Sequence, residues 1–268
     1  MGNIGWINTE NYTFDSMLRM ERFQIRLMLE NLCDDGTEVA MAAALKGNPK
    51  IAWLFAHKCP EMAECVKALS EQVPDNLTPD QIRAAEIRVM DEFEDFVIYT
   101  TPERMDQKCD FIYGWNRERL YEICDLEGKI VLDVGSGTGR LAFAAAEKAA
   151  FVTASEPVDS LREFMRDRIA EKDIRNMRVC DGLCHCLPFP DSSFDVVMSG
   201  HVVGDFFHEE VEELTRVTRP GGWLLDVPGD QHRETGRNEQ LLADGWEELA
   251  YTGSFGKTTY RYRKQVRK

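Results

Sequence analysis

The fold is decided by the stretch VLDVGSGTGR, residues 131–140. Apolar residues typical of a buried strand run into a turn with three glycines, and the turn opens a helix. Glycine has no Cβ, so the backbone of such a turn can approach a ligand closely. In open α/β sheets, ligands bind beyond the carboxyl ends of the strands. The stretch therefore predicts a ligand-binding loop at the edge of a parallel sheet.

The spacing of the glycines separates this loop from two related ones. Gly135 and Gly137 match the first two glycines of the dinucleotide fingerprint, but Arg140 holds its third glycine position. A P-loop is excluded, because no glycine stands five residues after Gly135 and no Lys-Ser/Thr pair follows. A nicotinamide-dependent dehydrogenase is therefore disfavoured.

Outward from the loop, short apolar segments alternate with helical patterns, as in a doubly wound parallel sheet covered on both faces. The chain ends differently, in two consecutive strands split by Gly253-Ser254-Phe255-Gly256, which predict a hairpin. The expected strands are 130–134, 151–155, 177–180, 194–199, 222–227, 246–251 and 258–266, and the expected helices between them are 140–149, 161–170 and 209–217.

The sequence before residue 128 has helical periodicity instead. Thr78 and Pro79 are typical of a helix start. We expect two domains, a mostly helical N-terminal cap at 1–127 and an α/β domain at 128–268. The expected helices of the first domain are 14–32, 37–46, 49–59, 79–99 and 115–124.

Composition limits the classes of function. The net charge of −15 disfavours nucleic acid, whose phosphates bind Lys and Arg. The basic end KTTYRYRKQVRK keeps a small RNA contact open, although a solvated last strand is the favoured interpretation. No apolar run could cross a membrane and no signal-peptide pattern begins the chain, so we expect a soluble, cytoplasmic protein with reduced thiols.

A carboxylate follows the second expected strand. Glu156 stands 17 residues after Gly139. An acidic side chain at this place can accept both hydroxyls of a ribose. The glycine loop before it favours this role over that of a solvated surface residue.

Four motifs together resemble a known family. They are DVGSGTG at 133–139 with Glu156, LPFPDSSFDVV at 187–197, and RVTRPGGW at 216–223. In this order they are similar to the class I S-adenosylmethionine-dependent methyltransferases, in particular the small-molecule branch called type 11, over roughly residues 128–266. The resemblance implies a Rossmann-like sheet of seven strands whose last strand is antiparallel.

The resemblance also implies residue roles. The loop Gly135-Ser136-Gly137-Thr138-Gly139 would hold the methionine portion of S-adenosylmethionine, with Asp133 positioning it, and Glu156 would bind the ribose. Residues 219–222 would form a structural turn into the fifth strand.

The adenine subsite departs from the family pattern. The family places an Asp four residues before the LPF block, where this chain has Leu183. Asp181 lies six residues before Leu187. Either Asp181 serves through a longer loop, or backbone groups at Leu183 and Cys184 take its place.

The segment after the fourth strand borders the methyl group and the substrate in this family. Ser199 is expected beside the cofactor. His201 titrates near neutrality and is the best candidate for a general base, with Asp205 and His208 behind it. A structural histidine at the strand end is the alternative. Upstream, Tyr113 and Trp115 are the aromatic residues expected, with His201, to line the substrate pocket.

A thiol cluster, Cys180, Cys184 and Cys186 around His185, is open to three interpretations. Thiolate and imidazole suit zinc, but the CxxxCHC spacing matches no usual zinc motif, so no metal is predicted. Substrate thiol chemistry and plain packing beside the adenine remain.

The sequence therefore predicts a methyltransferase that transfers a methyl group from S-adenosylmethionine to a small molecule. The alternative is a non-catalytic relative that binds S-adenosylmethionine as a sensor or partner protein. Neither the acceptor atom nor the oligomeric state is indicated by any pattern in the chain.

Overall fold

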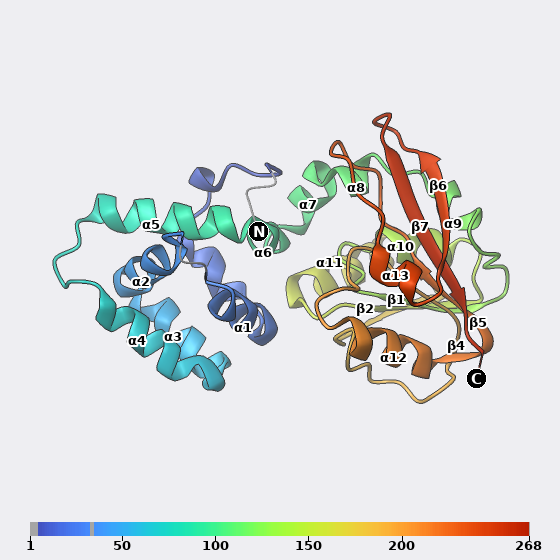
Figure 1. Ribbon diagram of the computed structural model, residues 1–268, viewed down its shortest axis with the longest axis horizontal. Coiled ribbons are helices and arrows are strands. Elements are labelled where there is room, and N and C mark those ends of the chain that lie inside the picture. Colours follow the sequence, from blue (N-terminus) through green and yellow to red (C-terminus); the bar gives the residue numbers. More distant parts are fainter. Residues whose placement is uncertain (1–4, 33–34, 268) are drawn as a thin grey trace. The chain divides into compact units, whose positions relative to one another are not determined.

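The computed structural model describes residues 5–32 and 35–267 (Figure 1). It divides into two compact units, Met1–Thr101 and Pro102–Lys268. Residues 102–127 group with the second unit, because Leu120, Ile123 and Leu126 are buried in the core on one face of its sheet. The division thus lies ahead of residue 127, where the sequence pattern changes.

Unit 1 is helical around one apolar core rich in methionine and alanine. Helix α2 packs against both α4 and α5. Its elements are η1 (Thr9–Asn11), η2 (Phe14–Arg19), α1 (Arg22–Glu30), α2 (Thr37–Gly47), α3 (Pro49–Lys58), η3 (Pro60–Met62), α4 (Ala63–Gln72), α5 (Pro79–Glu92) and α6 (Glu94–Tyr99).

Two expected helices of unit 1 are divided. The one expected at 14–32 begins as a 3₁₀ turn and restarts at Arg22, because Glu21 and Gln24 form a capping box that fixes a new N-terminus. The one expected at 79–99 breaks at Phe93, whose φ of −111° and ψ of 39° leave the helical region. Thr78 caps α5 through Gln81, as the sequence predicts.

Unit 2 holds one seven-stranded sheet in the order β3-β2-β1-β4-β5-β7-β6. The first five strands are parallel, and β7 is antiparallel to both neighbours. The predicted fold class is confirmed. The elements are α7 (Pro102–Lys108), α8 (Asp110–Tyr113), α9 (Glu118–Tyr121), β1 (Ile130–Val134), α10 (Arg140–Ala146), β2 (Phe151–Ser155), α11 (Asp159–Glu171), β3 (Met177–Cys180), β4 (Phe194–Ser199), α12 (Phe207–Val217), β5 (Thr218–Asp226), α13 (Glu239–Ala243), β6 (Glu247–Thr252) and β7 (Thr258–Gln265).

Alternate residues of the central strands enter two cores. Val131 and Leu225 join the core that includes α10, whereas Leu132 and Leu224 join the core that includes α12. This alternation follows from the period of two in a strand. Helices on both faces bury the parallel strands and leave their carboxyl edge for the loops.

Some elements of unit 2 differ from the expectation. The helix expected at 115–124 is limited to α9, while α7, α8 and α13 carry no periodic signal long enough to predict them. Strand β5 begins at Thr218, four residues before the expected start, because Thr218 already pairs with Phe194.

The basic C-terminal strand is neutralised locally. Arg261 lies 3.2 Å from Glu122, Arg263 2.7 Å from Glu247, and Lys264 2.8 Å from Asp244. Strand β7 is only partly solvated, because Arg261 is 4% exposed, and these ion pairs occupy its basic side chains. Within residues 5–32 and 35–267, no helix has the length and apolar character to span a membrane.

Candidate active site

The glycine loop between β1 and α10 has a backbone that only glycine adopts without strain. Gly135, Gly137 and Gly139 have φ angles of 64°, 57° and 91°. A Cβ on Gly135 would lie 2.5 Å from Val202 in the segment after β4. The amides of Gly135 and Ser136 both donate to the carbonyl of Ser155 at the end of β2, at 2.8 and 3.1 Å. The loop is thus held at the carboxyl edge of three adjacent strands.

Glu156 joins the tip of β2 to this loop. Its carboxylate accepts hydrogen bonds from the amide of Gly137 at 2.8 Å and from that of Val158 at 2.9 Å. The side chain is 4% exposed, and burial raises its pKa to about 7. A carboxylate has about four lone-pair sites, so two remain for further donors. The pair of hydroxyls on a ribose suits such an acceptor.

Asp133, near the end of β1, forms hydrogen bonds at both ends of the glycine loop. Its carboxylate accepts the Ala142 amide of α10 at 3.0 Å, and its carbonyl accepts the Ser136 hydroxyl at 3.0 Å. It is 1% exposed, and burial raises its pKa to about 7. Asp133 therefore fixes both ends of the loop, which agrees with the positioning role expected for it.

Two further polar residues end the next strands. Ser199 at the tip of β4 is fully buried, and its hydroxyl lies 3.4 Å from the carboxylate of Asp226 at the tip of β5. Burial raises the pKa of Asp226 to about 7. The sequence analysis missed Asp226, although an acidic residue at the end of an apolar strand is the same signal that identified Glu156.

Unsatisfied polar atoms gather where α10 begins. Arg140 donates to the Val227 carbonyl at 2.7 Å, and its guanidinium carbon lies 4.7 Å from the centre of the Trp115 ring. Arg140 Nη1, Trp115 Nε1 and Thr138 Oγ1 are buried and have no hydrogen-bond partner among the described residues. Buried polar groups normally have partners. These atoms, the glycine cradle and the spare acceptor sites of Glu156 fit the polar ligand expected here.

The two adenine candidates lie differently. Asp181 is exposed and pairs with Arg162 of α11 at 3.4 Å. Leu183 forms a bridge with Cys186, whose amide donates to the Leu183 carbonyl at 2.9 Å. Roles for both residues stay predictions.

His201 is held by a residue that the sequence analysis did not single out. Its Nε2 lies 3.1 Å from the side-chain amide of Gln231, which is 5% exposed, and its ring meets Phe111 edge-on at 5.0 Å. Asp205 and His208 are exposed, and in the described part of the chain neither is hydrogen-bonded to His201. Gln231 follows β5 in a loop without periodicity, so no sequence signal pointed to it.

Tyr113 and Trp115, both expected in the substrate pocket, contact different parts of unit 2. Tyr113 is 50% exposed and its hydroxyl lies 2.9 Å from Nε2 of His232, in the loop after β5. Trp115 lies under Arg140, beside the glycine loop. Of the two, Trp115 is the one that the structure brings to the cofactor loop.

The side chains of the thiol cluster lie in different environments and do not form one site. Cys184 is buried among apolar side chains such as Leu187, and burial raises its pKa well above its usual range. Cys186 is exposed, and Cys180 contacts the Ala154 carbonyl. Within the described ranges, no three His, Cys, Asp or Glu side chains are placed to hold a metal ion. The packing interpretation is the one that the position of Cys184 favours.

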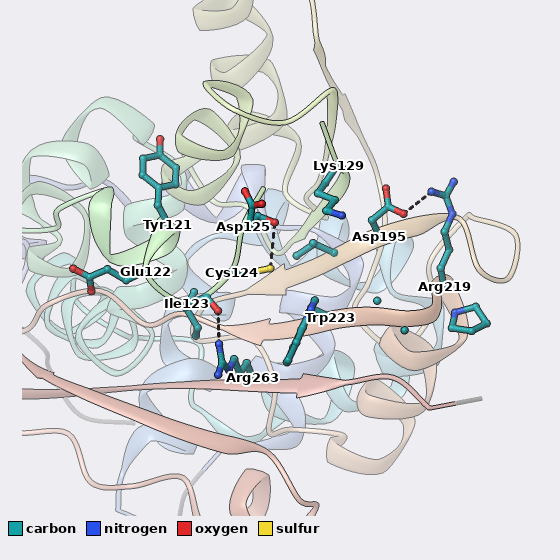
Figure 2. Close-up of a pocket in the computed structure, with 14 residues that line it drawn as sticks. Tyr121, Glu122, Ile123, Cys124, Asp125, Lys129, Asp195, Arg219, Trp223 and Arg263 are labelled. Carbon is teal, nitrogen blue, oxygen red and sulfur yellow. Dashed lines mark hydrogen bonds and ion pairs between the residues drawn. The ribbon is translucent and has the colours of Figure 1, made fainter. Parts of the chain in front are cut away.

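A hollow of about 470 Å³ opens at the opposite, amino edge of the sheet (Figure 2). Trp223, Lys129 and Cys124 line it, together with an ion pair of 2.6 Å between Arg219 and Asp195. Burial alone would raise the pKa of Asp195, but the Ile130 amide and Arg219 together lower it. The charged groups of this ion pair are thus satisfied, unlike Nη1 of Arg140 at the carboxyl edge.

Comparisons with known proteins show which proteins this domain resembles. Residues 132–226 match the model of a family described as methyltransferase domain. A demethylmenaquinone methyltransferase of Listeria monocytogenes is 30% identical over 122 residues, 44% of this chain and 52% of that protein. A ubiquinone/menaquinone biosynthesis C-methyltransferase of Cupriavidus taiwanensis is 36% identical over 140 residues, 48% of this chain and 57% of that protein. The chain thus spans about half the length of these curated relatives.

A solved structure has the same fold. It is a SAM-dependent methyltransferase from Aquifex aeolicus, 18% identical, with a TM-score of 0.50 over 62% of this chain and 98% of that one.

Proposed function

We propose that residues 132–226, which match a methyltransferase-domain family, form an S-adenosylmethionine-dependent methyltransferase domain, and that the protein transfers a methyl group to a small-molecule acceptor. The observation that carries the proposal is the Glu156 carboxylate, buried and bonded to the Gly137 amide at the carboxyl edge of the sheet. When bound, S-adenosylmethionine supplies an activated methyl group on a sulfonium.

Each of the proposed cofactor residues contacts a different part of S-adenosylmethionine. The backbone of residues 135–139 lies against the methionine portion, Asp133 holds this loop on α10, and Glu156 accepts the ribose hydroxyls. Asp181 or the backbone at Leu183 meets the adenine, and Ser199 closes the site from the tip of β4. The low exposure of Asp133, Glu156 and Ser199 supports these roles, because buried carboxylates and hydroxyls bind donors more strongly than exposed ones.

The acceptor side is formed by Trp115, Tyr113 and His201, with Asp205 further along the same loop and His208 in the first turn of α12. Arg140 covers one face of the Trp115 ring, and the remaining aromatic surface suits a flat, largely apolar acceptor. Demethylmenaquinone is the first acceptor to test, because the relatives carry its name. In this proposal the cap of the substrate site is the helical unit 1 alone, because residues 102–127 group with unit 2. Acceptor-dependent protection of unit 1 amides from hydrogen exchange would support the cap.

The test is calorimetric titration of the full chain with S-adenosylmethionine, S-adenosylhomocysteine and, as control, NAD. We expect micromolar binding of the first two and none of NAD. Acceptor screening with labelled methyl donor then follows. Absence of binding would overturn the proposal, whereas binding without transfer to any acceptor in a broad panel would favour the non-catalytic alternative.

A further inference from the structure

Three side chains after β4 and β5 form a directed hydrogen-bond chain. Nε of Arg233 donates to Oε1 of Gln231 at 2.7 Å, and the amide nitrogen of Gln231 lies 3.1 Å from Nε2 of His201. Arginine has only donors, so the Gln231 atom facing it is the carbonyl oxygen. The atom facing His201 is therefore the NH₂ group, which only donates. Nε2 of His201 must accept.

This direction determines the protonation of the imidazole. A neutral ring that accepts at Nε2 carries its proton at Nδ1. A second proton would have to sit on Nε2, opposite the NH₂ group of Gln231. The surrounding charges also oppose it. Desolvation of the ring first, and then the charges of Arg140 and Arg233, lower the pKa of His201 below its usual value, and Asp110 acts in the opposite direction. The residue as a whole is exposed, so this shift only adds to the direction that the hydrogen bonds impose.

The backbone fixes where the ring stands. His201 has a φ of 66°, a left-handed conformation that a non-glycine residue adopts only when its surroundings hold it. Phe111 contacts the ring edge-on, and the next residue, Val202, lies against Gly135 of the glycine loop. The imidazole is therefore both oriented and placed beside the cofactor loop.

We propose that Gln231, held by Arg233, is a positioning residue that keeps His201 as a neutral imidazole with Nδ1–H as a hydrogen-bond donor. His201 then binds the acceptor instead of removing its proton. The acceptor is consequently a molecule with a hydrogen-bond-accepting oxygen or nitrogen at this point, and any proton lost by its nucleophile leaves by another route than His201. The statement about the acceptor rests on the proposed function; the statement about the ring does not.

The first test is ¹⁵N NMR of the full chain labelled at histidine. His201 is assigned by the signals lost in His201→Asn. We expect the Nδ1–H tautomer, unchanged between pH 5 and 8. A ring protonated at Nε2, or a titration near pH 6.5, would overturn the proposal.

The second test reverses the direction of the hydrogen bond between residue 231 and His201. In Gln231→Glu the carboxylate still accepts from Arg233 but cannot donate, so His201 must carry a proton at Nε2 and its titration should move upward, into the pH 5–8 range. The matched control is Gln240→Glu on exposed α13, which should leave the His201 signals unchanged. An unchanged tautomer in folded Gln231→Glu would contradict the proposal.

A third variant covers the case in which the buried carboxylate prevents folding. Arg233 is exposed, so Arg233→Leu should fold and free the Gln231 amide to rotate, which gives a mixture of tautomers. Arg233→Lys keeps a donor and should restore the single form. A single unchanged tautomer in Arg233→Leu would overturn the role of Arg233. S-adenosylmethionine titration of the same samples tests the proposed function separately, because the NMR result does not require the cofactor.

Discussion

The two edges of the sheet in unit 2 offer a direct comparison. The amino edge has the hollow of about 470 Å³, yet its Asp195 is ion-paired and has a lowered pKa (Figure 2). The carboxyl edge has glycines at positive φ and three buried carboxylates, Asp133, Glu156 and Asp226, whose pKa burial raises to about 7. A glycine backbone at positive φ and buried carboxylates with raised pKa values, not the size of a hollow, mark the edge that can bind a ligand.

The largest expected effect is that of Glu156→Gln at the carboxyl edge. The amide cannot accept from Gly137, Val158 and two ribose hydroxyls together, and charge-assisted hydrogen bonds are each worth about 1.5–3 kcal/mol. Calorimetry should show S-adenosylmethionine binding weakened about 100-fold.

Asp195→Asn is the matched control at the amino edge. It should lower stability toward urea by weakening the bond to Arg219, while S-adenosylmethionine affinity stays unchanged. Equal affinity in wild type and Glu156→Gln, or a loss in Asp195→Asn, would break the contrast between the edges.

Gly137→Ala should have the next largest effect. The added methyl group, in the loop proposed to hold the cofactor, would lie 3.3 Å from the Met105 side chain. Binding should weaken about tenfold, roughly 1.4 kcal/mol. Gly128→Ala has a similar φ, 68° against 57°, and no atom within 4 Å of the added Cβ. Both variants carry the same left-handed strain, so a similar loss of affinity in both would show that the loop does not touch the ligand.

The raised pKa of Glu156 predicts a pH dependence. The carboxylate form dominates only above about pH 7, so S-adenosylmethionine affinity should fall as pH decreases from 8 to 5.5. Without cofactor, the free energy of unfolding should instead fall as pH rises from about 4.5 to 7. The reason is that Glu156 loses its proton at a lower pH in the unfolded chain than in the folded protein. Titration calorimetry and urea unfolding at matched pH values measure both slopes. A flat affinity profile would contradict the acceptor role of Glu156.

The smallest effect is expected at the amino edge. Trp223→Phe keeps an aromatic ring in the hollow, and Trp223 packs on the core at the edge of the sheet opposite the glycine loop. S-adenosylmethionine affinity should therefore change by less than about twofold. A clear loss would mean that the hollow communicates with the cofactor site.

The periodic elements could be predicted from the sequence. The bounds of β1, β2, β3 and β4 match the expected strands, because each is an apolar run between turn residues. The short helices α7, α8 and α13 could not be predicted, because four to seven residues are too few to show a helical period. The division of two helices in unit 1 was not predicted for another reason. A local capping box in one helix, and a single non-helical residue in the other, interrupts a pattern of apolar residues that is otherwise continuous.

The candidate site divides in the same way. The glycine loop and Glu156 are local signals, a turn chemistry and a carboxylate at a strand end, so the sequence by itself determined them together with the seven-stranded fold. His201 lies 30 residues before Gln231 in the sequence, and Arg233 follows shortly after Gln231. The three residues come together only because β4 and β5 end side by side. Tertiary structure decided which atom of His201 accepts a hydrogen bond, because hydrogen bonding depends on the donor that folding places opposite an atom, and no local pattern encodes that partner.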